Sequence, residues 1–259
     1  MPFTLAHPAA VIPIYRLAKS LSLPALVIGS LSPDLPYFIP INFNGLSSHS
    51  AFAILWFCLP VSLLMYAVYF LLLVPVLAEI LPTVIGCRLA LTHNSGRLPD
   101  VPRYIVVVSV IIGAVTHILW DSFTHARGIF VQALPPLQTT LVTVGGYSLH
   151  TYKLLQHGST IAGLGLLIYW ATKRSPQNDA IGASPRQLPS SYRAGVVMML
   201  TTLPLTVGLA SGLNGNGGAW LQQLQEFLRS VVVATGGAVI AFWVSTGIVY
   251  RLYGGRIKI

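Results

Sequence analysis

Long apolar stretches separated by short polar ones run along most of this chain. Residues 51–78 contain no charged residue and exceed the roughly 20 apolar residues that a helix needs to cross about 30 Å of hydrocarbon. Similar stretches predict further spans at 104–124, 194–213 and 231–250. Residues 158–170 are apolar but too short to cross alone, so we expect their helix to begin near Ser148 and to cover 148–172. The pattern therefore predicts about five transmembrane helices.

The stretch from 8 to 31 is apolar but is broken by prolines and basic residues, namely Pro13, Arg16, Lys19 and Pro24. It predicts two short helices at the membrane surface or against the bundle. No basic region precedes it, so we expect no cleaved signal peptide. The predicted fold is an all-α, polytopic membrane helical bundle. We expect a membrane domain over 1–172, a polar loop over 173–193 and a two-span hairpin over 194–259.

Composition supports a membrane protein. Hydrophobic residues make up 54% of the chain and charged residues 8%, against about 25% charged residues in a soluble domain. The net charge of +9 comes from basic residues scattered between apolar runs, which argues against nucleic acid as a partner. Five of the fifteen Lys and Arg fall on the side of the N-terminus and ten on the other. The positive-inside rule then predicts that the C-terminus lies in the cytoplasm and the N-terminal region outside it.

The histidines gather on one side of this predicted topology. The six acids split evenly between the two sides, but Asp34 and Asp121 are the two that accompany the histidines. Six of the seven histidines lie on the outer side, and these are His7, His49, His117, His125, His150 and His157. Distant parts of the chain thus converge on one face, where we expect the site. His150 has no supporting context and is interpreted as a surface histidine.

The strongest local signal is the segment from His117 through Asp121 to His125. Residues four apart share one helix face, so His117 and Asp121 can bind the same ion. The backbones of His117 and His125 are about 12 Å apart along the axis, so Asp121 could bridge two metals, with His125 on the second or as an outer partner. A helix end explains His125 alone, but not Asp121, because an acid at membrane depth costs about 2.5–3.5 kcal/mol.

The remaining candidates are ambiguous one by one. Asp34 lies between Pro33 and Pro36, a context that is also typical of a helix cap or turn. His7 and His49 each precede an apolar segment, and the serines near His49 could simply cap the helix that follows. These residues gain weight because they share a side with His117 and Asp121.

Taken in order, the motifs resemble a bacterial membrane family of unknown function related to the membrane-bound predicted metal-dependent hydrolases. Their order is similar to that in zinc-dependent phospholipase C and its nuclease relatives. The resemblance implies a location in the bacterial inner membrane. The resemblance covers about residues 1–165 and rests on these motifs: His7-Pro8, Ser32-Pro33-Asp34, His49-Ser50, Thr116-His117, Trp120-Asp121, Phe123-Thr124-His125, Lys153 and Gln156-His157.

The resemblance implies one metal held by Asp34, His49, His117 and Asp121, and another held by His7 with Asp121. Two features depart from the phospholipases, in which the mature N-terminal amine is a ligand and a histidine is followed four residues later by Glu. Here Met1 shows no sign of processing, and Ile161 stands four residues after His157. A three-metal site is therefore not expected, and His125 and His157 remain candidates for a second metal or for proton transfer.

The sequence thus predicts a membrane-bound hydrolase with one or two divalent ions, zinc being expected for nitrogen and carboxylate ligands. We expect the substrate to be a phosphate ester of a lipid. Asp34 would be a ligand and possible base, His125 or His157 would protonate the leaving oxygen, and Lys153 or Arg127 would pair with phosphate. The alternative is a non-catalytic protein that stores or transports metal ions or protons. The uncharged, histidine-free spans 51–78, 194–213 and 231–250 argue against a conduction path.

Overall fold

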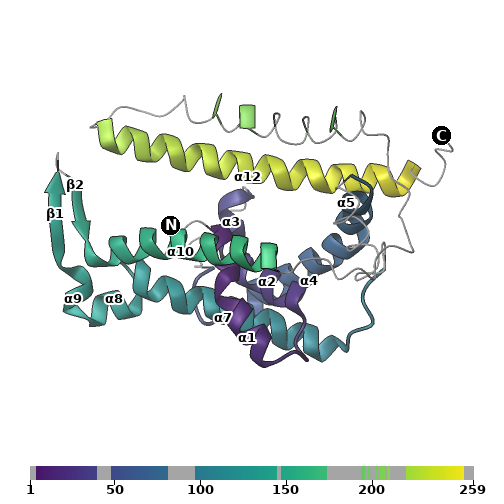
Figure 1. Ribbon diagram of the computed structural model, residues 1–259, viewed down its shortest axis with the longest axis horizontal. Coiled ribbons are helices and arrows are strands. Elements are labelled where there is room, and N and C mark those ends of the chain that lie inside the picture. Colours follow the sequence, from purple (N-terminus) through teal and green to yellow (C-terminus); the bar gives the residue numbers. More distant parts are fainter. Residues whose placement is uncertain are drawn as a thin grey trace. The chain divides into compact units, whose positions relative to one another are not determined.

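The computed structural model describes residues 4–39, 48–80, 97–144, 147–173 and 220–253, together with scattered positions between 194 and 210. These residues are mostly helical (Figure 1). They form two compact units. The first takes its residues from 1–36, 40–66 and 101–175, and the second from 37–39, 67–100 and 176–259.

Two short helices form over 8–31 as predicted, α1 (Pro8–Leu17) and α2 (Leu23–Leu31). Each has a proline in its first two positions, where the missing N–H is not needed. A 3-10 turn, η1 (Thr4–Ala6), precedes them. After α2 the chain tightens into a second such turn, η2 (Ser32–Asp34), and then the short α3 (Leu35–Phe38).

The first predicted span is a helix with two wide turns. It consists of η3 (Ile54–Cys58), α4 (Leu59–Val68), η4 (Tyr69–Leu73) and α5 (Val74–Ile80), in which η3 and η4 are π-helical. Each π turn ends two residues before a proline, Pro60 or Pro75. Proline lacks an N–H and its ring collides with the carbonyl four residues earlier, so a wider turn just before it relieves the clash.

The second span is α7 (Arg103–Thr124), and it leads into two short helices, α8 (Ile129–Ala133) and α9 (Pro135–Gln138). An antiparallel hairpin follows, β1 (Thr140–Val144) with β2 (Tyr147–His150), which corrects the expectation of an all-α chain. The Thr and Val content of β1 favours strand. Because β2 takes up residues 147–150, the next helix, α10 (Thr151–Lys173), begins later than the predicted Ser148.

The second unit contains the long helix α12 (Trp220–Tyr253). Near its end the Tyr250 hydroxyl donates to the Glu79 carboxylate at 2.5 Å, and the Arg251 guanidinium donates to the Leu71 carbonyl at 2.9 Å. The acid at the end of α5 thus has a hydrogen-bond donor, which lowers the cost of placing it at a span end.

Three helical segments among the described residues are long and apolar enough to cross a membrane: Ile54–Glu79, Arg103–Ala133 and Phe227–Leu252. They correspond to three of the five predicted spans. The predicted span at 148–172 is present as the helix α10, but the polar residues in its first half keep it out of this group. The predicted span at 194–213 lies mostly outside the described residues, as does the loop at 173–193. The orientation, which depends on five spans, stays a prediction.

Helices α2 and α7 approach each other at two glycines. A Cβ added to Gly29 would collide with the backbone carbonyl of Val110, and one added to Gly113 would collide with that of Leu26. Close to this crossing, the Ser22 N–H at the start of α2 donates to the Ser109 hydroxyl on α7 at 2.9 Å. Small residues allow such close helix contact in membranes, where dispersion forces hold helices together.

We expect Gly113→Ala to destabilise the protein by about 1–3 kcal/mol, because the new methyl group must push α2 away from α7. Gly165→Ala is the matched control, since a Cβ at Gly165 meets no atom within 4 Å. It should be neutral or stabilise the helix by up to about 1 kcal/mol. Thermal unfolding of both variants in the same detergent measures the difference, and equal midpoints would contradict the close crossing.

Candidate metal centre

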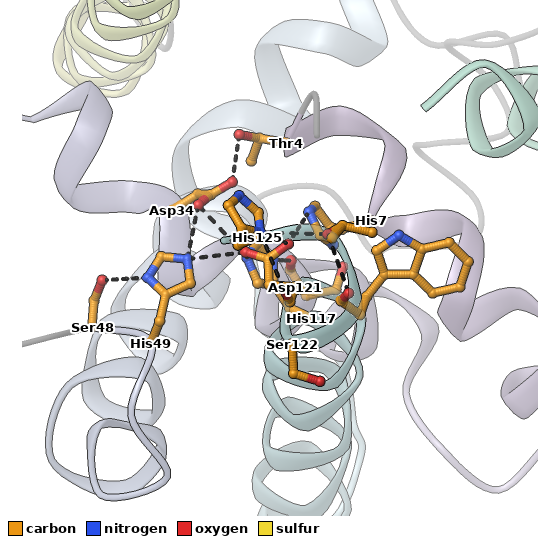
Figure 2. Close-up of polar contacts among 12 residues, drawn as sticks. Thr4, His7, Asp34, Ser48, His49, His117, Asp121, Ser122 and His125 are labelled. Carbon is orange, nitrogen blue, oxygen red and sulfur yellow. Dashed lines mark hydrogen bonds and ion pairs between the residues drawn. The ribbon is translucent and has the colours of Figure 1, made fainter. Parts of the chain in front are cut away.

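Four side chains from three segments converge in the first unit (Figure 2). Asp34 ends η2, His49 precedes η3, and His117 and Asp121 lie on one face of α7. One potential ligand atom from each lies within 4.8 Å of all the others. Two ligands on opposite sides of a zinc ion are about 4 Å apart, given bonds of about 2 Å. The four atoms are therefore close enough to share one metal ion.

In this group two carboxylate oxygens alternate with two imidazole nitrogens. Asp34 Oδ1 lies 3.1 Å from His49 Nε2 and 3.6 Å from His117 Nε2. Asp121 Oδ2 lies 3.4 Å from His49 Nε2 and 3.3 Å from His117 Nε2. The i, i+4 pairing of His117 with Asp121 is the one that the sequence predicts.

Neighbouring groups orient these ligands. The Thr4 hydroxyl donates to Asp34 Oδ2 at 2.6 Å, which leaves Oδ1 facing the histidines. His117 Nδ1–H donates to the Ser30 carbonyl at 2.7 Å. This bond fixes the tautomer and leaves the lone pair of Nε2 directed at the carboxylates, as metal-binding histidines require. The Ser48 hydroxyl contacts His49 Nδ1 at 3.0 Å.

The second oxygen of Asp121 faces a different pair of histidines. Asp121 Oδ1 lies 3.6 Å from His7 Nε2 and 3.3 Å from His125 Nδ1. The His7 ring stacks on that of His117, with centroids 3.7 Å apart. Asp121 therefore lies between two groups of nitrogen ligands, one on each oxygen, as the spacing along α7 suggests. We call these six residues the cluster: Asp34, His49, His117, Asp121, His7 and His125.

Three buried atoms at the centre have no hydrogen-bond partner among the described residues. They are His7 Nε2, His117 Nε2 and Asp121 Oδ1. Leaving a buried polar atom unpaired costs about 1–3 kcal/mol. All three atoms lie in the two groups of potential ligands around Asp121, so bound cations would satisfy them together. The residues present therefore fit a metal site.

Burial and neighbouring charges shift the pKa values of Asp34, His49 and His7. Burial raises the pKa of Asp34, but the imidazoles of His117 and His49 outweigh burial and hold that pKa well below its usual range. Burial lowers the pKa of His49, but the carboxylates of Asp121 and Asp34 raise it more, so the result is above the ordinary value. Burial, with the neighbouring His117, lowers the pKa of His7 to about 4. His7 is thus neutral near pH 7 and able to bind a cation.

The other predicted residues lie apart from these contacts. His157 is exposed on α10, and within the described ranges no hydrogen bond or ion pair joins it to the cluster. Lys153 donates to the Ser148 carbonyl at 3.4 Å, and Arg127 is exposed. His150 is half-buried, contacts the Ser148 carbonyl and stacks on Tyr152.

Sequence reasoning missed Thr4 and Ser30. Thr4 is one of many hydroxyls in the chain, and Ser30 acts through its backbone carbonyl, which carries no residue-specific signal. Ser50 caps the following turn by accepting from the Ala53 N–H at 3.1 Å. Ser48 instead contacts His49, so the serines beside His49 serve both as cap and as support for the ligand.

The chain belongs to the family defined by a domain of unknown function, DUF4184, whose model matches residues 1–247. Comparisons with curated proteins and with solved structures find no match. The family match covers the cluster, α7 and α10 but assigns no chemistry to them.

We expect protein purified without chelator to carry at least one divalent metal ion per chain. Asp34→Asn and His117→Gln keep the side-chain size but remove a ligand, so each should lower metal affinity at least tenfold. His157→Gln is the matched control, because His157 is exposed and outside the cluster, and it should retain the metal. Elemental analysis after dialysis measures the content. Wild-type protein that binds no divalent metal would contradict the site.

Metal affinity should fall as the pH is lowered from 8 to 6. A metal must displace the proton of His49, whose raised pKa means that this proton is held more tightly than usual. Each displaced proton reduces affinity about tenfold per pH unit below that pKa. His7, with a pKa of about 4, should contribute no competing proton in this range. Calorimetric titration with zinc tests this, and a pH-independent affinity would show that His49 is not a ligand.

Proposed function

We propose that this protein is a membrane-bound metal-dependent hydrolase that cleaves phosphate esters carried by lipids. The observation that carries the proposal is the position of Asp121, whose two oxygens face two separate groups of histidines. A carboxylate between two ligand groups is the arrangement expected for a two-metal centre, and such centres stabilise both the attacking and the leaving oxygen of a phosphate ester. The motif order shared with zinc-dependent phospholipases supports the same reaction class by analogy.

Each residue of the cluster then has a role that its contacts support. Asp34, His49, His117 and Asp121 would hold one ion, while His7 with the other Asp121 oxygen would hold a second. When bound, such ions lower the pKa of a water ligand towards 7 and offset the charge of the phosphate. Zinc is the metal that this donor set favours. Both Asp34 oxygens are engaged, so we assign Asp34 as a ligand rather than as a base.

His125 is the candidate for proton transfer. It directly follows α7, and its side chain is 31% exposed, whereas that of His117 is fully buried. A histidine at the rim of the cluster can exchange protons with solvent and still contact Asp121. This position suits the protonation of a leaving oxygen.

Metal or proton transport is supported less well. A path across the membrane needs polar groups on several helices near the midplane. The cluster involves only one of the three candidate spans, α7, and its other members lie on the segments before the first span.

The test is Asp121→Asn. The change is nearly isosteric but removes the charge that both ligand groups share, so kcat for phosphate esters should fall at least about a hundredfold. The fold should survive, because an acid in a membrane helix is neutralised. Asp100→Asn, the same change at an exposed position, should leave activity unaltered.

Activity is measured with p-nitrophenyl phosphate and bis-p-nitrophenyl phosphate in the presence of zinc or manganese, alongside thermal unfolding. Wild-type protein that holds metal yet hydrolyses neither these esters nor phospholipids would overturn the proposal and favour metal storage or transport. An Asp121→Asn variant that unfolds at much lower temperature would instead indicate a structural ion-pair cluster.

A further inference from the structure

A large apolar cavity lies within the first unit beside the cluster. Its volume is about 670 Å³, and it is lined by residues of α1, α7 and α10, which is a size typical of small-molecule sites. Most of the wall is hydrocarbon, from side chains such as Ala9, Pro13, Phe123, Leu155 and Leu166. His7 is part of the same wall. The cavity therefore borders the cluster at the residue whose ring stacks on His117.

The polar groups of the wall are already hydrogen bonded. The Trp120 indole N–H donates to the Ser159 hydroxyl at 3.2 Å, and that hydroxyl donates to the Gln156 carbonyl at 3.1 Å. The Thr160 and Thr124 hydroxyls donate to backbone carbonyls one turn earlier. Apart from His7, no residue lining the cavity is ionisable. A sugar, a peptide or a nucleotide would find little to bind here, whereas a hydrocarbon chain needs no polar partner.

We propose that this cavity binds a hydrocarbon chain of the lipid phosphate ester and that His7 marks the point where chain and headgroup meet. The inference rests on the proposed function and adds a chain site to it. A chain in the cavity would place its polar end beside His7, whose Nε2 lies 3.6 Å from Asp121. A helix of another protein is a poorer occupant. An α-helix with its side chains is about 10 Å across, so the cavity would hold fewer than two of its turns.

Two glycines on α10 provide a matched pair of variants. Gly158 lines the cavity and Gly165 does not, yet a Cβ added to either meets no atom within 4 Å. Gly158→Leu should therefore fill part of the cavity without straining the backbone packing. Gly165→Leu makes the same change on the same helix outside the cavity.

The first measurement uses p-nitrophenyl alkyl phosphates with chains of 2 to 16 carbons. Water adds to phosphorus, the bond to the nitrophenyl oxygen breaks, and nitrophenolate, an alkyl phosphate and a proton are released. In the wild type, kcat/KM should rise about fourfold for each methylene that enters the cavity. Gly158→Leu should lower the ratio of the 16-carbon to the 2-carbon value at least tenfold, whereas Gly165→Leu should keep it. The longer esters partition into detergent equally for every variant, so comparing this ratio between variants cancels the effect of partitioning.

The second measurement needs no turnover. Hexadecyl phosphate carrying a diazirine near its methyl end is photolysed with the protein in nanodiscs, and labelled peptides are identified by mass spectrometry. Label on the cavity walls of α1 and α10 should be lost in Gly158→Leu and kept in Gly165→Leu. A hexadecanol probe with the same diazirine should label the walls at least tenfold less, because it lacks the phosphate.

The two measurements separate the failures. Ester hydrolysis with an unchanged chain-length ratio in Gly158→Leu overturns the chain site and leaves the proposed function standing. Absence of hydrolysis with cavity labelling that Gly158→Leu removes supports the chain site and overturns the hydrolase. Equal labelling by hexadecanol shows that the cavity holds any membrane lipid, and this overturns the inference.

Discussion

The contact between α2 and α7 at Gly29 and Gly113 sets the positions of the polar groups in the cluster. It brings the last turn of α2 against the middle of α7, so that the Ser30 carbonyl accepts a hydrogen bond from His117. Asp34 follows within one turn of the same chain segment. A side chain at either glycine would separate the two helices. Packing between apolar helices thus controls the geometry of charged groups at one end of α7.

Charge is the second constraint on this end of the first unit. Two carboxylates lie among four imidazoles, and Asp34 is only 2% exposed. Buried carboxylates require compensation, which protons on the histidines or bound cations can supply. Among the described residues, buried atoms of His7, His117 and Asp121 have no hydrogen-bond partner. Cations would use all of these atoms, and for this reason we favour a metal centre over a network of ion pairs.

The sequence predicted those parts of the site that depend on local geometry. The pairing of His117 with Asp121 follows from helical spacing, and the two helices over 8–31 follow from proline positions. The approach of His7 and Asp34 could be expected only from a shared side of the membrane and from the resemblance. The role of Ser30 could not be predicted, because its carbonyl reaches α7 through packing across 87 residues. The hairpin at 140–150 was missed because a search for spans passes over short β-branched segments.

The order of the ligands along the chain has a consequence for folding. Asp34 and His49 are 15 residues apart, and their partners on α7 come much later. An ion bound by all four would bind only the folded chain, so its binding free energy would add to the stability of the fold. Metal loss would then remove this contribution, while the contact of α2 with α7 would still hold the N-terminal segment in place. Synthesis must reach Asp121 on α7 before the earlier ligands can close on it, so the centre can form only after most of the first unit has been made.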